Sequence, residues 1–344
     1  SGIRVNCVAP GFIDIHVHGG NGKSFQGSGV DAFLDIAELH ARFGTTTLLP
    51  TTYAGTTETY VDMFETFREI GDRNNKGAYM PGIHMEAPYF SRAQGGAQGA
   101  TIRDFDEKEY TMLIERYGDF IIRWSAAPEL PGVENFAKAC RDAGIYMSIG
   151  HSDAEYDRVL EAYDMGFDCV THLYSCTSTV HRRNAYRYAG VVEAAYMIDG
   201  MDVEIIADGK HLPASLLKFV VKHKGVDRIS VITDAISCAG LPDGAEKMFK
   251  NPGFIIEDGV CKLPDRSAFS GSVCTTNRLV RNMINMADCT LLDAVRMATA
   301  NPARMANLRD RGTIREGAYA DIVIFDDNID VSLTMVNGNV VFEG

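Results

Sequence analysis

Short apolar runs, rich in β-branched residues, alternate along most of the chain with longer segments in which apolar residues recur at helical spacing. The runs are typical of buried β-strands, and the longer segments are typical of amphipathic helices. Strands are predicted at residues 10–18, 45–50, 79–86, 120–127, 144–151, 169–172, 203–208 and 229–234. Helices are predicted between them at residues 30–42, 57–74, 106–117, 134–143, 154–165 and 213–224, and after the last strand at 275–286 and 291–300.

Eight strands that alternate with helices imply parallel βαβ units, so we expect a (β/α)₈ TIM-like barrel over residues 10–307. The alternative is an open doubly wound sheet, but no G-x-G-x-x-G sequence follows the first strand. A glycine-rich stretch at 240–259 is expected to be an insertion. From residue 312 the pattern changes to short strands at 322–325, 333–336 and 339–342. These strands predict a small β module outside the barrel, to which we assign residues 1–9 and 308–344.

Composition and charge narrow the class of protein. The chain has 344 residues, of which 46% are hydrophobic and 23% charged, as in ordinary globular proteins. Its net charge of −13 argues against nucleic acid or an anionic membrane as a partner of the whole molecule. The eight cysteines form no Cys-x-x-Cys pair, and no apolar run is long enough to span a membrane. We therefore expect a soluble, cytoplasmic protein with reduced thiols.

Metal-ligating side chains stand at the ends of five predicted strands. In the first strand, His16 and His18 share one face because side chains alternate between faces. The carboxyl ends of all strands of a barrel meet at one rim, where active sites lie. Nitrogen and oxygen ligands that converge there are suited to one or two divalent ions such as Zn²⁺ or Fe²⁺. The residues concerned are His16, His18, Glu86, His151, His172 and Asp234.

Each of these residues also has a simpler interpretation. His16 and His18 could be two surface histidines at a strand end. His151 and Asp234 could belong to helix caps, Glu86 to a turn, and His172 to a satisfied core position. All these interpretations would have to hold together, with every residue at a strand end by coincidence, so we favour the metal site. His40 and His223 lie within amphipathic helices, and we predict that both are surface residues.

Two further features indicate hydrolytic chemistry on a charged substrate. A divalent ion lowers the pKa of bound water and polarises a carbonyl, and a nearby carboxylate must then carry a proton. Asp234, alone at the end of the eighth strand, is the best candidate for this role. Residues 176–190 carry three arginines and a histidine but no acidic residue. Arginine matches a phosphate in charge and geometry, although a solvated loop explains the composition equally well.

Taken together, these segments resemble the amidohydrolase superfamily and, within it, the deacetylases that act on N-acetylglucosamine 6-phosphate. The similar segments follow the order of that family along nearly the entire chain: residues 10–20, 82–88, 150–152, 171–174, 206–211, 231–235, 269–272 and 297–303. The resemblance implies hydrolysis of an acetamide by a metal-activated water, with the amino sugar phosphate as a small-molecule partner. It also implies a β-sandwich beside the barrel and a homodimer.

The resemblance also assigns roles to individual residues. Glu86, His151 and His172 would hold the principal ion, and His16 and His18 a second one. Asp234 would be the general base and acid, His211 a substrate ligand, and Arg187 a phosphate ligand. The residues that fall where the family contacts the sugar are Ala97, Ser175, Cys176, Phe269, Ser270 and Gly271.

The chain departs from the family in two places. After His172-Leu173-Tyr174 the family usually has Asn-Ala-Met, whereas this chain has Ser175-Cys176-Thr177. The departure leaves the exact sugar open, so the galactosamine epimer stays an alternative. A relative that acts on a cyclic amide is a further alternative, which the arginine-rich loop disfavours. Only nine residues precede Pro10, so we expect an incomplete sandwich or a missing N-terminal segment. A non-catalytic barrel that serves as a binding module is disfavoured, because all six ligands are present.

Overall fold

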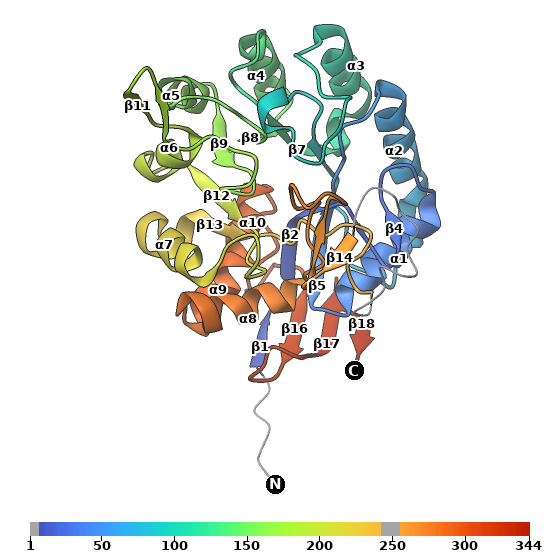
Figure 1. Cartoon of the computed structure of the whole chain (residues 1–344). Coiled ribbons are helices and arrows are strands. Elements are labelled where there is room, and N and C mark those ends of the chain that lie inside the picture. The colour runs from blue at the N-terminus through green and yellow to red at the C-terminus, as the bar shows by residue number, and fades with distance from the viewer. Residues whose placement is uncertain (1–6, 242–254) are drawn as a thin grey trace.

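The computed structural model describes residues 7–241 and 255–344, and the predicted insertion at 240–259 therefore falls largely outside the described residues. Parallel strands occupy the centre of the molecule and helices surround them (Figure 1). The central strands are β2 (Phe12–Val17), β5 (Thr45–Pro50), β6 (Ile83–Glu86), β7 (Ile121–Ala126), β8 (Tyr146–Ile149), β9 (Phe167–Val170), β12 (Asp202–Ile205) and β13 (Ile229–Val231). The helices are α1 (Val30–Ala41), α2 (Thr57–Ile70), α3 (Glu107–Tyr117), α4 (Val133–Asp142), α5 (Tyr156–Asp164), α6 (Val191–Met197), α7 (Ala214–Lys224), α8 (Thr276–Ala287), α9 (Leu291–Met297) and α10 (Ala300–Met305).

The central strands form two parallel sheets that single bridges connect. Six strands pair in the order β13-β12-β9-β8-β7-β6, and β2 pairs with β5. Bridges from Thr47 to Tyr79 and from Thr51 to His84 join β5 to the chain at β6, and a bridge from Val17 to Ala235 joins β2 to the chain after β13. The carboxyl ends of all these strands therefore lie on one side, as predicted for a TIM-like barrel.

The first strand shows why its sequence positions the site. Ile13 and Ile15 belong to an apolar cluster that includes residues of α10. Asp14 and His16 instead contact polar groups, because Thr233 donates to Asp14 at 2.5 Å and His16 lies against Glu204. The alternation of side chains thus separates an apolar face of the strand from a face that carries polar side chains of the candidate site.

The two ends of the described chain form one antiparallel sheet beside the central strands (Figure 1). It contains β1 (Cys7–Pro10), β16 (Ile322–Phe325), β17 (Val331–Val336) and β18 (Asn339–Glu343), in that order. Gly11 leads directly from β1 to β2, and a Cβ at this position would collide with the side chain of Thr46. The glycine therefore permits the close approach that links this sheet to the central strands.

Several elements differ from the prediction. Within the arginine-rich stretch, β10 (His181–Arg183) and β11 (Tyr186–Tyr188) form a hairpin, and α6 follows it. The two-residue turn between β10 and β11 is possible because Asn184 and Ala185 both adopt positive φ angles, of 51° and 72°. The predicted helix at 291–300 is two helices, α9 and α10, interrupted at Thr299. Two short pairs complete the structure: β3 (Gly19–Gly20) with β4 (Lys23–Ser24), and β14 (Ile255–Glu257) with β15 (Val260–Lys262).

The prediction that His40 is a surface residue was wrong. Its side chain is buried in α1, and its Nε2–H donates to the carbonyl oxygen of Gly19 at 3.0 Å. Burial lowers the pKa of His40 to about 4, so the imidazole is neutral at physiological pH. His223, at the end of α7, is exposed as predicted. Within the described ranges, no helix is both long and apolar enough to cross a lipid bilayer.

Candidate metal centre and active site

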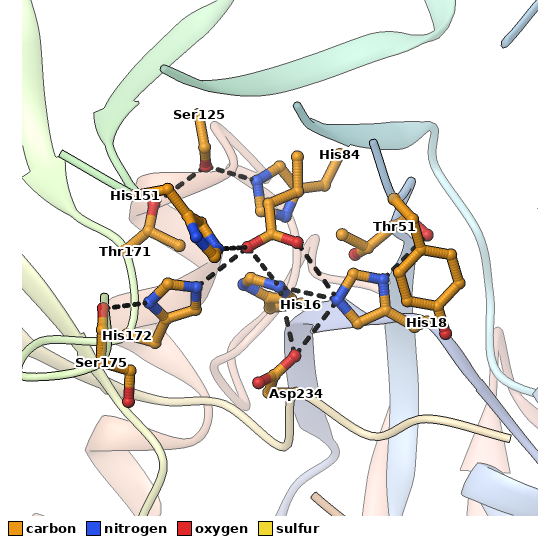
Figure 2. Close-up of polar contacts among 12 residues, drawn as sticks. His16, His18, Thr51, His84, Ser125, His151, Thr171, His172, Ser175 and Asp234 are labelled. Carbon is orange, nitrogen blue, oxygen red and sulfur yellow. Dashed lines mark hydrogen bonds and ion pairs between the residues drawn. The ribbon is translucent and has the colours of Figure 1, made fainter. Parts of the chain in front are cut away.

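Three of the predicted ligands occupy an unusual backbone conformation just beyond their strands. His151, His172 and Asp234 have φ angles of 48°, 31° and 48°. The predicted strands included these residues, but a positive φ cannot continue a strand, so β8, β9 and β13 end two to three residues earlier. Non-glycine residues in this region carry strain, which is typical of functional sites. The turn points all three side chains toward one centre (Figure 2).

Glu86, the last residue of β6, lies at this centre and is 1% exposed. Its Oε1 atom is 2.9 Å from Nε2 of His172 and 3.2 Å from Nε2 of His151. Its Oε2 atom is 3.3 Å from Nε2 of His18. Nε2 of His16 lies 3.6 Å from Oε1, so three histidines adjoin Oε1 and His18 adjoins Oε2.

The outer nitrogen of every histidine in the cluster faces an oxygen acceptor. A carbonyl or carboxylate oxygen only accepts, so each Nδ1 is protonated and donates outward. Each Nε2 then faces the centre of the cluster. This pattern is the one that fixes metal-ligating histidines in proteins. The Nδ1 contacts are His16 to Glu204 Oε2 (3.4 Å), His18 to Thr51 O (3.3 Å), His151 to Gln94 O (2.9 Å) and His172 to Ser175 O (3.1 Å).

The charges of the cluster favour positive charge at its centre. Burial by itself would lower the pKa of His16, but the carboxylates of Glu86 and Glu204 outweigh it and raise this pKa to about 10. The pKa of His151 is likewise raised to about 10, against burial, by Cys176 and Glu86. A divalent ion supplies the same positive charge through the same nitrogens. Two sets of buried ligand atoms each lie within 4.8 Å of one another, His16/His18/Glu86 and Glu86/His151/His172, so the residues fit such an ion.

Asp234 belongs to neither set but adjoins both histidines of the first strand. Its Oδ1 atom is 3.1 Å from Nε2 of His18 and 3.5 Å from Nε2 of His16, and its side chain is 14% exposed. Burial would raise the pKa of Asp234, yet the hydrogen bond from His18 and the charge of His16 lower it below its usual value. A carboxylate that is ionised, next to a candidate metal centre and open to a cavity is equipped to accept a proton.

A cavity of about 340 Å³ opens above the cluster. All the predicted site residues line it except His16, which lies beneath, and Arg187. The residues are His18, Glu86, Ala97, His151, His172, Ser175, Cys176, His211, Asp234, Phe269, Ser270 and Gly271. His211 is held by Asp208, whose carboxylate accepts from its Nδ1 at 2.7 Å, so Nε2 stays available to a ligand.

Arg187 lies on the exposed hairpin formed by β10 and β11, away from the cavity lining. Its guanidinium donates to the carbonyl oxygen of Ala185 at 3.0 Å, within the same hairpin. Neither lysine nor arginine lines the described part of the cavity. The structure therefore does not bring this predicted residue together with the others.

The sequence profile of the amidohydrolase family matches residues 7–341. The chain belongs to the amidohydrolase family. Enzymes of this superfamily depend on metal, and the two His/Glu sets are the candidate ligands of this amidohydrolase.

Three proteins show what this amidohydrolase is similar to. N-acetylglucosamine-6-phosphate deacetylase of Lysinibacillus sphaericus is 30% identical over 96% of this chain and 84% of its own. N-acetylgalactosamine-6-phosphate deacetylase of Escherichia coli O157:H7 is 28% identical over 96% of this chain and 86% of its own. The crystal structure of N-acetylglucosamine-6-phosphate deacetylase from Thermotoga maritima superposes with a TM-score of 0.89, at 29% identity, over 100% of this chain and 91% of that one.

Sequence reasoning missed three residues of the site. Tyr53 stacks on the ring of His18 at a centroid distance of 4.3 Å, and Gln98 contacts Glu86. Glu204 supports His16 from within β12. A signal existed for two of them, because Tyr53 follows the second strand at the same rim and Glu204 is an acidic residue inside an apolar run. Gln98 stands in a loop, where no periodicity marks it.

Proposed function

We propose that this amidohydrolase removes the acetyl group of N-acetylglucosamine 6-phosphate, giving glucosamine 6-phosphate and acetate. The observation that carries the proposal is the convergence of Glu86, His151 and His172 with Asp234 at one cavity. The chain is also similar over most of its length to deacetylases of this name. A cavity of about 340 Å³ is large enough for a sugar of this size.

Glu86, His151 and His172 would hold the principal divalent ion, and His16 and His18 would hold a second one together with Glu86. Imidazole and carboxylate ligands favour Zn²⁺ or Fe²⁺. Such an ion lowers the pKa of a bound water toward neutrality and polarises the carbonyl oxygen of the acetamide.

Asp234 carries the proton of the reaction. Water adds its hydroxyl to the carbonyl carbon, and its proton passes to the carboxylate of Asp234. The C–N bond then breaks as Asp234 returns this proton to the departing nitrogen, which leaves as the amine. The lowered pKa of Asp234 keeps the carboxylate ionised before the reaction, as this role requires.

The other residues of the cavity would bind the sugar. His211, oriented by Asp208, presents Nε2 to a hydroxyl or carbonyl oxygen of the substrate. Phe269 packs at 4.7 Å from the ring of His211, and the chain continues through Ser270 and Gly271 along the lining. Ala97, Ser175 and Cys176 complete the sugar subsite on the other side.

The resemblance to the family assigns the phosphate to Arg187, although this residue lies on the exposed hairpin and does not line the cavity of the same chain. Its neighbour Arg183 is already engaged, because it donates to Glu155 at 2.7 Å and stacks on Tyr188 at 4.0 Å. Arg187 forms no ion pair with the described residues, so its charge is available to a phosphate dianion.

We extend the proposal to the molecule as a whole. Residues 10–307 would form a closed (β/α)₈ barrel, and residues 1–9 with 308–344 a small β-sandwich module. The resemblance to the family supports a homodimer, and composition supports a cytoplasmic location. Analytical ultracentrifugation tests the oligomeric state.

The galactosamine epimer is the second candidate substrate, since a relative of 28% identity carries that activity in its name. Two residues of the departure, Ser175 and Cys176, line the cavity, where they can change the choice of epimer. Acetate release from a panel of N-acetyl hexosamines, with and without the 6-phosphate, tests both candidates when metal content is measured on the same sample. Hydrolysis of a cyclic amide such as a hydantoin in preference to every sugar would refute the proposal.

A further inference from the structure

Gln98 links Glu86 to the loop that follows β5. Its Oε1 accepts from the backbone N–H of Ala54 at 2.8 Å, and its Nε2 donates to Oε2 of Glu86 at 2.8 Å. A backbone N–H can only donate, so the amide oxygen must face Ala54 and the amide nitrogen must face Glu86. The orientation of the side chain is therefore determined by its two partners.

This contact makes the two oxygens of Glu86 unequal. Oε1 lies 2.9 Å from His172 and 3.2 Å from His151, with Gln98 on the other oxygen. Oε2 lies 3.3 Å from Nε2 of His18, whereas Nε2 of His16 lies 3.6 Å from Oε1, so Oε2 is the oxygen that would face an ion beside His18. An N–H donor on Oε2 uses one of its lone pairs and reduces its strength as a ligand.

We propose that Gln98 is a positioning residue that makes the two ligand sets of the metal centre unequal in their affinity for metal. The two sets, or halves, are Glu86/His151/His172 and His16/His18/Glu86. It holds the Glu86 carboxylate with Oε1 directed to His151 and His172, and it weakens Oε2 as a ligand for the His16/His18 half. The half that contains His151 and His172 therefore fills first, and the other half fills only at higher metal concentration. This inference rests on the metal centre of the proposed function but not on the identity of the substrate.

Gln26 provides a matched control, because it supports the backbone of the same loop after β5. Its Oε1 accepts from the backbone N–H of Tyr53 at 2.9 Å, one residue before Ala54. Within the described part of the chain, Gln26 does not line the cavity and forms no hydrogen bond with Glu86. A substitution of Gln26 removes loop support alone, whereas a substitution of Gln98 removes loop support and the contact with the carboxylate.

The test is a titration of metal-free protein with Zn²⁺ against a chromophoric chelator, without substrate. The wild type is expected to bind a first ion tightly and a second more weakly. Loss of an outer contact to a metal ligand typically lowers affinity by about 10–100-fold. In Gln98→Leu we therefore expect the first dissociation constant to rise by about this factor while the second stays constant or falls. Gln26→Leu is expected to behave like the wild type.

Gln98→Asn is the second variant, since it keeps an amide in the loop but is one methylene too short to join Ala54 and Glu86. It should shift the ratio of the first to the second dissociation constant for Zn²⁺ in the same direction as Gln98→Leu. If the leucine variant does not fold, Gln98→Asn by itself tests the inference. An unchanged ratio in the Gln98 variants, or the same change in Gln26→Leu, would overturn the inference. If the zinc titrations give the expected constants but the protein has no deacetylase activity, the proposed substrate is refuted and the inference stands. If the protein does not bind zinc, the metal centre and the inference are refuted together.

Discussion

The Nε2 atoms of His16 and His18 lie 3.2 Å apart (Figure 2). Each ring has its Nδ1 against an acceptor, Glu204 for His16 and Thr51 for His18. With both Nδ1 atoms directed at acceptors, both Nε2 atoms face the same small space beside the carboxylates of Glu86 and Asp234. A divalent cation in this space would replace the protons on these Nε2 atoms, so the pair can act as a chelating unit.

The first prediction concerns the number of ions. His18→Asn should lower the metal bound at saturating Zn²⁺ from two ions per chain to one, because Glu86, His151 and His172 remain. Elemental analysis after gel filtration measures this. His223→Asn, on the exposed end of α7, is the control and should keep the wild-type content. Retention of two ions in His18→Asn would contradict the prediction, and so would the loss of both.

The second prediction separates proton transfer from metal binding. Asp234→Asn keeps the size of the side chain but removes the group that accepts the proton. We expect kcat for acetate release to fall by a factor on the order of 10³, with unchanged metal content, since Asp234 belongs to neither ligand set. Steady-state kinetics and metal analysis of one preparation test both parts. Normal turnover in this variant would exclude Asp234 as the proton carrier.

The candidate site was predictable from sequence mainly because parallel strands bring their carboxyl ends together. His16, Glu86, His151 and Asp234 are far apart along the chain, and only the regular alternation of strands and helices places them at one rim. The polar residues at strand ends were therefore a strong signal. Their positive φ angles were not predictable, because they come from the turn that leaves each strand.

Contacts made by loops and by helix packing escaped prediction. The periodicity of α1 shows that it is amphipathic, but it does not show that α1 approaches the turn after His18. Gly20 allows this approach, since a Cβ there would collide with Leu39 and lie 3.4 Å from Nε2 of His40. The burial of His40 is thus a tertiary effect, and so is the contact between Gln98 and Glu86.

The third prediction tests the phosphate subsite. Arg187→Ala should raise KM for the 6-phosphorylated substrate by about 10–100-fold, which corresponds to one or two charged hydrogen bonds, and should leave kcat nearly unchanged. Activity on the unphosphorylated sugar should not change. Arg183→Ala is the matched control, because that arginine is committed to Glu155 and Tyr188. Equal effects of the two substitutions, or an equal loss on both substrates, would place the phosphate elsewhere.

The last prediction concerns stability and pH. His40 has a pKa of about 4 in the folded chain and an ordinary value of 6.5. Because the folded value is the lower one, the unfolded chain binds a proton first as the pH falls, so the stability contributed by a neutral His40 is complete above pH 6.5 and decreases toward pH 4. Linkage gives a loss of about 2 kcal/mol from this group between pH 7 and pH 5.

His40→Gln keeps an N–H donor for the carbonyl oxygen of Gly19 but does not titrate in this range. Urea unfolding at pH 7 and pH 5 should therefore show a drop in the free energy of unfolding that is about 2 kcal/mol smaller in this variant than in the wild type. His223→Gln should show the full wild-type drop, because that imidazole is exposed. If His40→Gln loses as much stability as the wild type, the buried imidazole is not the group that links folding to protons in this window.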